Sequence, residues 1–132
     1  MTGLNVRISL ASAEADLEAV VWPGVSTVYC PRVESAAQLR AIDDIVGRLE
    51  RLRGIRPGTV RLQPLIESAR GVVAAGEIAP ASARTDAFGP GPKLSLHLDA
   101  ERGEALAYAR DECELVARAF ELEPVSTEYL GD

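Results

Sequence analysis

The chain has 132 residues, of which 47% are hydrophobic and 26% charged, and its formal net charge at pH 7 is −6. This length fits one domain, residues 1–132, and excludes a complete eight-stranded β/α barrel of about 250 residues. No apolar run reaches the ~20 residues of a membrane span and no signal-peptide pattern is present, so we expect a cytoplasmic protein without a membrane partner. The acidic balance and the low aromatic content of 5% argue against a nucleic-acid partner.

The first half of the chain predicts two strands and two helices. Residues 4–10 alternate apolar and polar side chains, which is typical of a strand, and residues 14–21 favour a short helix. Residues 25–30 are rich in β-branched side chains and predict a second strand. Ser35 and Gln38 form a capping-box pattern, which predicts the start of a helix whose apolar residues recur at three- and four-residue spacing.

The second half continues the alternation. The predicted elements are a strand over residues 59–66, a helix over 70–78, a short strand over 86–88, a helix over 101–120 and a last strand over 124–127. The density of Gly and Pro at residues 89–92 predicts a loop. One face of the last helix should carry Leu106, Ala109, Cys113, Val116 and Phe120. Strands separated by helices favour consecutive βα units and a parallel sheet.

The cysteines, the single histidine and the arginine-rich segment predict no special chemistry. Cys30 and Cys113 lie in apolar patterns and lack CxxC spacing, so we interpret them as buried, reduced thiols. His97 has no second His or Cys near it, which argues against a zinc site or a nucleophile pair. The arginines of residues 48–56, interrupted by Glu50, are interpreted as the solvated end of a helix.

Sites in parallel α/β sheets lie beyond the carboxyl ends of the strands. This rule selects Arg7 and residues 31–34, 67–71 and 89–93. Glu67 follows an apolar run, where a carboxylate would be partly buried and would need a cation partner. Simpler interpretations stay open. Arg7 could point outward on an edge strand, and Glu67 could be a carboxylate at a helix N-terminus that is stabilised by the helix dipole. Residues 89–92 could be only a connection between two elements.

Several segments resemble one enzyme family. Residues 65–72 read L-I-E-S-A-R-G-V and residues 74–79 read A-A-G-E-I-A, which is similar to the L-I-E-T-A-R-G-V…A-A-E-I-A signature of citrate lyase β-subunit-like proteins. These proteins belong to the HpcH/HpaI aldolase and citrate lyase superfamily. Residues 6–8 (V-R-I), 31–35 (P-R-V-E-S) and 107–110 (A-Y-A-R) resemble its V-R-I-N, P-K/R-V-E-S and L-Y-A-R segments in the same order.

The resemblance implies a TIM-barrel enzyme that uses Mg²⁺ to cleave or form C–C bonds in acyl-CoA thioesters or 2-oxo acids. In such an enzyme a carboxylate pair holds the metal, which stabilises the enolate, and an arginine binds the substrate carboxylate. Glu67 matches one metal carboxylate and Arg7 matches the arginine.

Two departures from the family pattern qualify these expectations. The family motif F-G-P-G-D-L-S-L-S-L carries the second metal carboxylate, but residues 88–98 read F-G-P-G-P-K-L-S-L-H-L, with Pro92 and Lys93 in place of the Asp. Asp86 and Asp99 are near in sequence but do not match the motif position. Since Lys repels Mg²⁺ at short range, we expect weak or absent Mg²⁺ binding by the isolated chain.

The second departure is length. The chain matches the family from about the third to the seventh barrel strand, so we expect an incomplete or partner-completed barrel with two open edges and an apolar free face. Such a sheet predicts a homo-oligomer or a hetero-complex. Two functions follow: a citrate lyase β-like C–C lyase with Arg7 and Glu67 in its site, or a catalytically inactive truncated paralogue that serves as a binding or assembly module.

Overall fold

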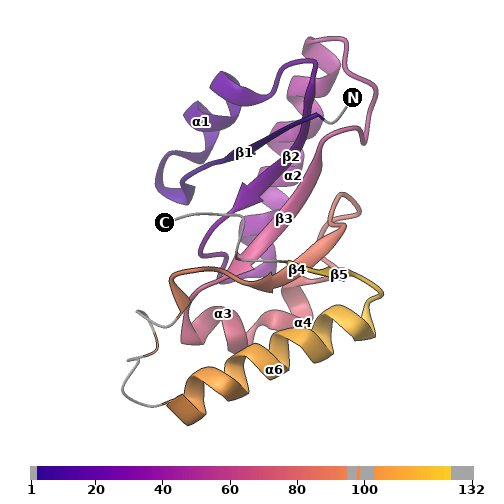
Figure 1. The fold of residues 1–132 in the computed structure, drawn as a ribbon. Coiled ribbons are helices and arrows are strands. Elements are labelled where there is room, and N and C mark those ends of the chain that lie inside the picture. The colour runs from indigo at the N-terminus through magenta and orange to yellow at the C-terminus, as the bar shows by residue number, and fades with distance from the viewer. Residues whose placement is uncertain (1–2, 95–97, 99–102, 126–132) are drawn as a thin grey trace.

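The centre of the molecule is a parallel sheet of five strands in the order of the sequence, β1-β2-β3-β4-β5 (Figure 1). The computed structural model describes residues 3–94, 98 and 103–125. The strands are β1 (Leu4–Arg7), β2 (Val25–Cys30), β3 (Arg61–Ile66), β4 (Ala87–Pro90) and β5 (Glu123–Pro124). Between them lie η1 (Leu10–Ser12), α1 (Ala13–Val20), α2 (Ala36–Leu52), α3 (Ala69–Val73), α4 (Ala75–Ile78) and α6 (Gly103–Ala119). The predicted α/β fold of consecutive βα units is confirmed, and among these five strands β1 and β5 are the edges of an unclosed barrel.

Helix α2 forms where the capping box predicts it and lies behind the sheet (Figure 1). The Ser35 hydroxyl accepts a hydrogen bond from the Gln38 amide at 3.2 Å, and the Gln38 side chain accepts one from the Ser35 amide at 3.2 Å. The apolar residues of the helix are buried together with residues of β2 and β3 in one core, which includes Leu39, Ile42, Val46, Leu49, Val28 and Leu62. None of the described helices is long and apolar enough to cross a membrane.

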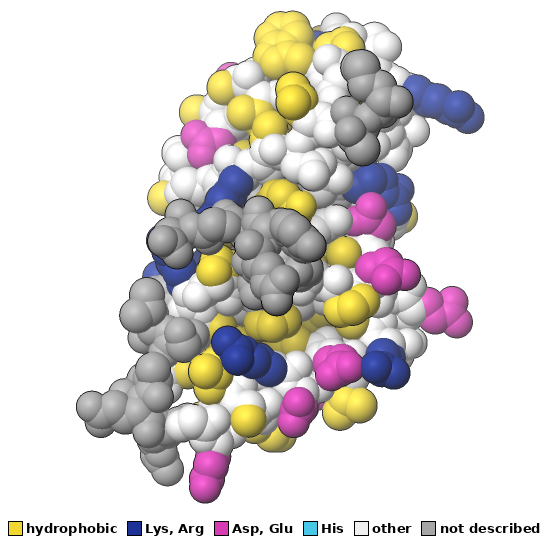
Figure 2. Space-filling view, viewed as in Figure 1, with side chains coloured by type: hydrophobic (Ala, Val, Ile, Leu, Met, Phe, Trp, Pro, Cys, Tyr) yellow, Lys and Arg dark blue, Asp and Glu magenta, His cyan; other side chains and the backbone are white. Residues whose placement is uncertain are grey.

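The face of the sheet turned away from α2 differs from the expectation. Side chains alternate between the two faces of a strand, so the neighbours of Val28 and Leu62 point to the free side. On β1, β2 and β3 these residues pair across the strands and are mostly polar: Asn5, Arg7, Thr27, Tyr29, Arg61 and Gln63. Charged side chains are scattered over this side of the molecule (Figure 2). The predicted apolar free face is therefore wrong for these strands.

The end of β4 is a second correction. Gly89 and Pro90 were predicted to lie in a loop, but they are strand residues paired with Leu65 and Ile66. Proline is tolerated at this last strand position because the next ladder hydrogen bond is donated by the Gly91 amide to the Ile66 carbonyl at 2.9 Å. The chain leaves the sheet only after Pro90.

Other boundaries shift for local reasons. The first strand ends at Arg7 because the Ser9 amide donates to the Asp16 carboxylate at 2.8 Å, which begins the turn into η1. The single helix predicted over residues 70–78 is two short helices that meet at Ala74. In α6 the buried residues are four apart, so Ala117 is in the core and Phe120 is 41% exposed, contrary to its predicted place on the buried face.

A buried ion network, which the sequence did not predict, includes Glu50, the acid among the arginines of residues 48–56. Glu50 is fully buried, and both its oxygens accept hydrogen bonds from the Arg84 guanidinium at 2.7 and 2.8 Å. Arg84 also donates to Asp43 at 2.7 Å, and the Gly58 and Val60 amides donate to Glu50. Burial opposes ionisation of Glu50, but these hydrogen bonds outweigh it and lower its pKa. The network joins α2 to the segments that flank β3 and precede β4.

Candidate functional site

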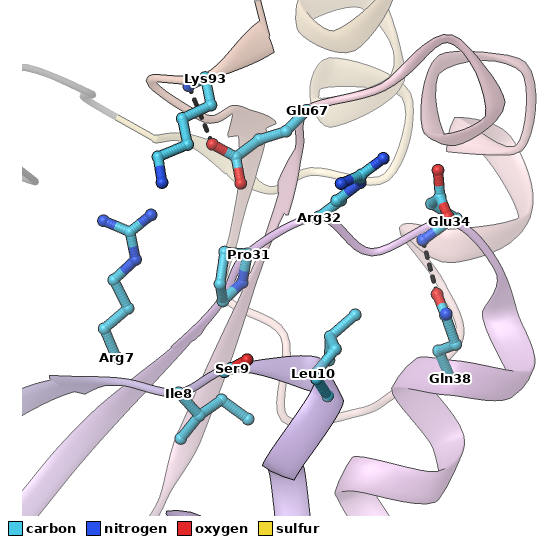
Figure 3. Close-up of a pocket in the computed structure, with 11 residues that line it drawn as sticks. Arg7, Ile8, Ser9, Leu10, Pro31, Arg32, Glu34, Gln38, Glu67 and Lys93 are labelled. Carbon is cyan, nitrogen blue, oxygen red and sulfur yellow. Dashed lines mark hydrogen bonds between the residues drawn. The ribbon is translucent and has the colours of Figure 1, made fainter. Parts of the chain in front are cut away.

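A cleft of about 860 Å³ opens at the carboxyl ends of the strands (Figure 3). It is built from the end of β1 and the following turn, the segment between β2 and α2, the first turns of α2, and the segments after β3 and β4. Its lining residues are Arg7, Ile8, Ser9, Leu10, Ala11, Pro31, Arg32, Glu34, Gln38, Glu67 and Lys93. The cleft therefore lies where the rule for parallel sheets places a site, and it contains both Arg7 and Glu67.

Glu67 is held at the floor of the cleft by its position in the chain. It follows Ile66, the last residue of β3, and precedes Ser68, the N-cap of α3. The side chain is only 2% exposed, and its Oε2 atom accepts a hydrogen bond from the Lys93 backbone amide at 2.9 Å. The sequence predicted partial burial and a cation partner. In the described structure the carboxylate is fully buried and its hydrogen-bond donor is a backbone amide.

Gly91 makes room for this carboxylate. A Cβ atom at position 91 would lie 2.5 Å from both Cγ and Cδ of Glu67, far inside van der Waals contact. The Gly91 amide is also bonded to the Ile66 carbonyl at 2.9 Å, so the loop cannot simply swing away. The glycine of this loop is thus needed for its close approach to Glu67.

Arg7 and Lys93 direct their charged ends into the same part of the cleft as the Glu67 carboxylate (Figure 3). Arg7 is the last residue of the edge strand β1 and is exposed, and its side chain lines the cleft. Lys93 lies beyond β4, on the segment whose backbone is bonded to Glu67. The structure brings together the two residues that the sequence singled out, with a lysine beside them.

Arg32 and Glu34 form the other wall. Arg32 follows β2 with φ = +56°, a left-handed conformation that is uncommon for residues other than glycine. The Glu34 carboxylate accepts a hydrogen bond from the Ser68 hydroxyl at 2.6 Å. The carboxyl-end rule selected both residues, whereas the turn residues Ser9 and Leu10 were missed because they were predicted to extend the first strand.

Asp86, another acidic candidate, does not join the cleft. Asp86 accepts a hydrogen bond from Gln63 at 3.1 Å and lies 3.8 Å from the Arg61 guanidinium, on the free face of the sheet. Asp99 and His97 lie outside the described residues, as does the predicted strand end at Thr127.

The donor set of the cleft does not fit Mg²⁺. This cation needs near-octahedral oxygen coordination, usually with carboxylates. Glu67 has one oxygen engaged by the Lys93 amide, and the Lys93 ammonium lies in the same cleft. Among the described residues, no group of three His, Cys, Asp or Glu side chains is arranged to hold a metal.

Comparisons with known proteins identify the family and agree with the fold. Residues 4–130 match the family model described as HpcH/HpaI aldolase/citrate lyase. Citrate lyase subunit beta of Escherichia coli (strain K12) is 33% identical over 131 residues, which cover 94% of this chain and 43% of that protein. The chain thus spans less than half the length of this relative.

Solved structures show the same architecture. RipC from Yersinia pestis has a TM-score of 0.71 and 24% identity, over 92% of this chain and 56% of that chain. A magnesium and glyoxylate complex of Haloferax volcanii malate synthase has a TM-score of 0.65 and 19% identity, over 87% of this chain and 36% of that chain. Because the family model matches nearly the whole of this chain, the chain belongs to the HpcH/HpaI aldolase/citrate lyase family.

Proposed function

We propose that this chain binds the carboxylate of a 2-oxo acid or acyl-CoA substrate in the cleft, as part of a lyase or aldolase, and that alone it does not perform Mg²⁺-dependent C–C cleavage. The observation that carries the proposal is the meeting of Arg7, Glu67 and Lys93 in one cleft. Family membership supports a lyase or aldolase kind of function. The side chains of the cleft support the absence of Mg²⁺-dependent cleavage, because Pro92 and Lys93 stand at the motif position of the second metal carboxylate.

Arg7 is the residue that binds the substrate carboxylate in this proposal. Its planar guanidinium offers paired N–H donors that match the two oxygens of a carboxylate. The side chain extends from the last position of β1 into the cleft, and among the described residues it has no hydrogen-bond or ion-pair partner that would compete. Glu67 acts as a positioning residue, because its carboxylate holds the Lys93 backbone at the cleft.

The first experiment measures binding and turnover separately. Isothermal titration should show pyruvate binding to the purified chain, and Arg7→Gln should weaken this binding at least tenfold. Arg40→Gln removes an exposed arginine of α2 outside the cleft and should have no effect. Citryl-CoA and malyl-CoA should not be cleaved with or without millimolar Mg²⁺. If the chain does not bind pyruvate, or if Arg7→Gln and Arg40→Gln weaken pyruvate binding equally, the proposed role of Arg7 is wrong. If the chain cleaves either thioester with Mg²⁺ and Glu67→Gln abolishes this cleavage, the chain is an active Mg²⁺-dependent lyase and that part of the proposal is wrong.

The open sheet favours a second candidate function, a module for binding or assembly. Among the described strands, β1 is an edge of the five-stranded sheet without a further partner, and Leu4 on this strand is 66% exposed. Unpaired strand edges are templates for pairing with another chain. With this second function, the chain would act as part of a homo-oligomer or a hetero-complex. Measuring its state of association in solution tests this function.

A further inference from the structure

The cleft combines an excess of positive charge with carboxylates that are already engaged. Three cationic side chains, Arg7, Arg32 and Lys93, line it, against the two carboxylates of Glu34 and Glu67. The protein as a whole carries a net charge of −6, so this local excess runs against the general charge. A small anion would be attracted to this cleft more than to the remaining surface.

The two carboxylates are held by the protein itself. Glu34 accepts the Ser68 hydroxyl at 2.6 Å and Glu67 accepts the Lys93 amide at 2.9 Å. By contrast, no described residue forms a hydrogen bond or an ion pair with the charged ends of Arg7 or Lys93. The two cations are therefore available to a ligand that enters the cleft.

The backbone of Lys93 is held in place by hydrogen bonds and by its buried neighbour. Its amide is bonded to a buried carboxylate, and the neighbouring Leu94 is 1% exposed, with its amide donating to the Gly91 carbonyl at 3.2 Å. Only the side chain is left to move, and it extends toward the Arg7 guanidinium (Figure 3). A cation whose backbone is already ordered loses less conformational freedom when it binds a ligand.

We propose that Lys93 makes the cleft a metal-independent site for a dicarboxylate, in which Arg7 binds one carboxylate and the Lys93 ammonium binds the other. This inference rests on the proposed function, since it assumes that Arg7 binds a substrate carboxylate. It adds a specificity-determining residue: Lys93 stands where a metal ligand is expected and supplies the positive charge directly. A monocarboxylate uses only Arg7, so the second ionic contact separates the two ligand classes.

The test compares succinate with propionate by isothermal titration in a chelating buffer. The wild-type chain should bind succinate about tenfold more tightly than propionate, and adding millimolar Mg²⁺ should change neither affinity. Lys93→Gln should remove this preference by weakening succinate binding more than propionate binding. Arg7→Gln should weaken both acids, and the matched control Arg40→Gln should change neither.

The outcomes distinguish the inference from the proposed function. If propionate binds through Arg7 but Lys93→Gln leaves the succinate preference intact, the role of Lys93 is wrong and the proposed function stands. If Arg7→Gln changes the affinity for neither acid, both the role of Lys93 and the proposed function are wrong. Succinate binding that needs Mg²⁺ would overturn metal independence, and inorganic phosphate binding as tightly as succinate would overturn selectivity for dicarboxylates.

A charge reversal provides a second, independent readout. Lys93→Asp places a carboxylate beside Glu67 and should abolish the succinate preference. It should also raise the thermal midpoint in millimolar Mg²⁺, because a ligand that binds only the folded state stabilises it. Retention of the succinate preference in this variant would overturn the inference even if the Lys93→Gln chain failed to fold.

Discussion

At the scale of single residues, the cleft depends on a few close approaches. Gly91 leaves the space that the Glu67 side chain fills, and the Lys93 amide completes the hydrogen bond to the Glu67 carboxylate. A buried carboxylate without a donor would be strongly destabilising, so these three residues act as one unit. Arg32, in a left-handed conformation, turns the chain into the opposite wall.

The substitution Gly91→Ala tests this unit. The added Cβ would lie 2.5 Å from Glu67 carbons, so we expect a loss of about 1–3 kcal/mol in the free energy of unfolding, measured by urea denaturation. Gly76→Ala is the matched control, because no atom lies within 4 Å of a Cβ there and alanine favours the helix. Combining Gly91→Ala with Glu67→Ala should recover part of the loss; a purely additive result would show that the two positions do not interact.

Repair of the loop is a second prediction at this scale. We expect that replacing the pair Pro92–Lys93 by one Asp lets Mg²⁺ raise the thermal midpoint, while the parent chain responds little, because one engaged carboxylate is a poor Mg²⁺ site. Adding Glu67→Gln should cancel the gain. A repaired chain that responds no more than the parent would mean that the loop does not bring the new carboxylate to Glu67.

At the scale of elements, the Arg84 network joins parts of the chain that apolar packing alone would not orient. The Arg84 guanidinium binds Glu50 with two hydrogen bonds and Asp43 with one, and Ser82 donates to Asp43 at 2.6 Å. A buried charge is tolerated because nearly every polar atom has a partner. The network holds α2 against the segment that leads into β4, and Gly91 and Lys93 follow directly after this strand.

We expect Glu50→Gln to lower the free energy of unfolding at pH 7 by about 3–5 kcal/mol, since it leaves Arg84 buried with one ion-pair partner fewer. The pKa of Glu50 is lower in the folded chain than its ordinary value of 4.5. Its stabilising effect is therefore complete above that value and is lost as pH falls through the folded pKa. Urea denaturation from pH 7 to pH 3 should show the difference between wild type and variant narrowing in acid.

An exposed ion pair is the control for this experiment. Glu114 and Arg118 form an i,i+4 pair at 2.9 Å on α6, with both side chains more than half exposed. Glu114→Gln should cost less than about 0.5 kcal/mol at any of these pH values. An equal effect of the two substitutions would refute the special role of the buried network.

The two cysteines are inert structural residues at this scale. Burial raises the pKa of the Cys30 thiol to about 12, and burial together with the nearby Glu112 raises that of Cys113 to about 12. Thiolate is the reactive form, so a thiol reagent such as 5,5′-dithiobis-nitrobenzoate should label neither residue at pH 8 until the chain unfolds. Rapid labelling in native buffer would show that α6 or β2 opens readily.

At the scale of the whole molecule, the open sheet decides how the chain can associate. The two edges of the described sheet are β1 and the two-residue strand β5, and the free face between them is largely polar on β1, β2 and β3. A polar face can remain hydrated, so association should proceed through an edge rather than through this face.

We expect sedimentation velocity at micromolar concentration to show a homo-oligomer. Leu4→Lys places a charge on the β1 edge and should shift the chain toward monomer, because edge lysines oppose strand pairing. Leu52→Lys is the control, since Leu52 is 73% exposed at the end of α2. A monomeric wild type, or equal shifts in both variants, would count against the β1 edge as the interface.

Much of this protein was determined by the sequence alone, because the signals are local. Side-chain periodicity and the Ser35 capping box predicted the strands and α2, and the motif over residues 65–72 predicted the family. The carboxyl-end rule placed Arg7 and Glu67 at one edge of the sheet, and both line the cleft. Each of these inferences needs only residues near in sequence, or a general property of parallel sheets.

The tertiary structure decided what depends on residues far apart in the chain. Glu50 and Arg84 are 34 positions apart, and no local pattern specified their pairing. Gly89 and Pro90 became strand residues because they pair with Leu65 and Ile66 of β3. The Lys93 amide reaches Glu67 across 26 positions, which no local pattern specifies. Long-range packing, rather than local preference, sets these contacts. Each contact forms only when two elements have folded and packed against each other, so neither residue is stabilised by it before then.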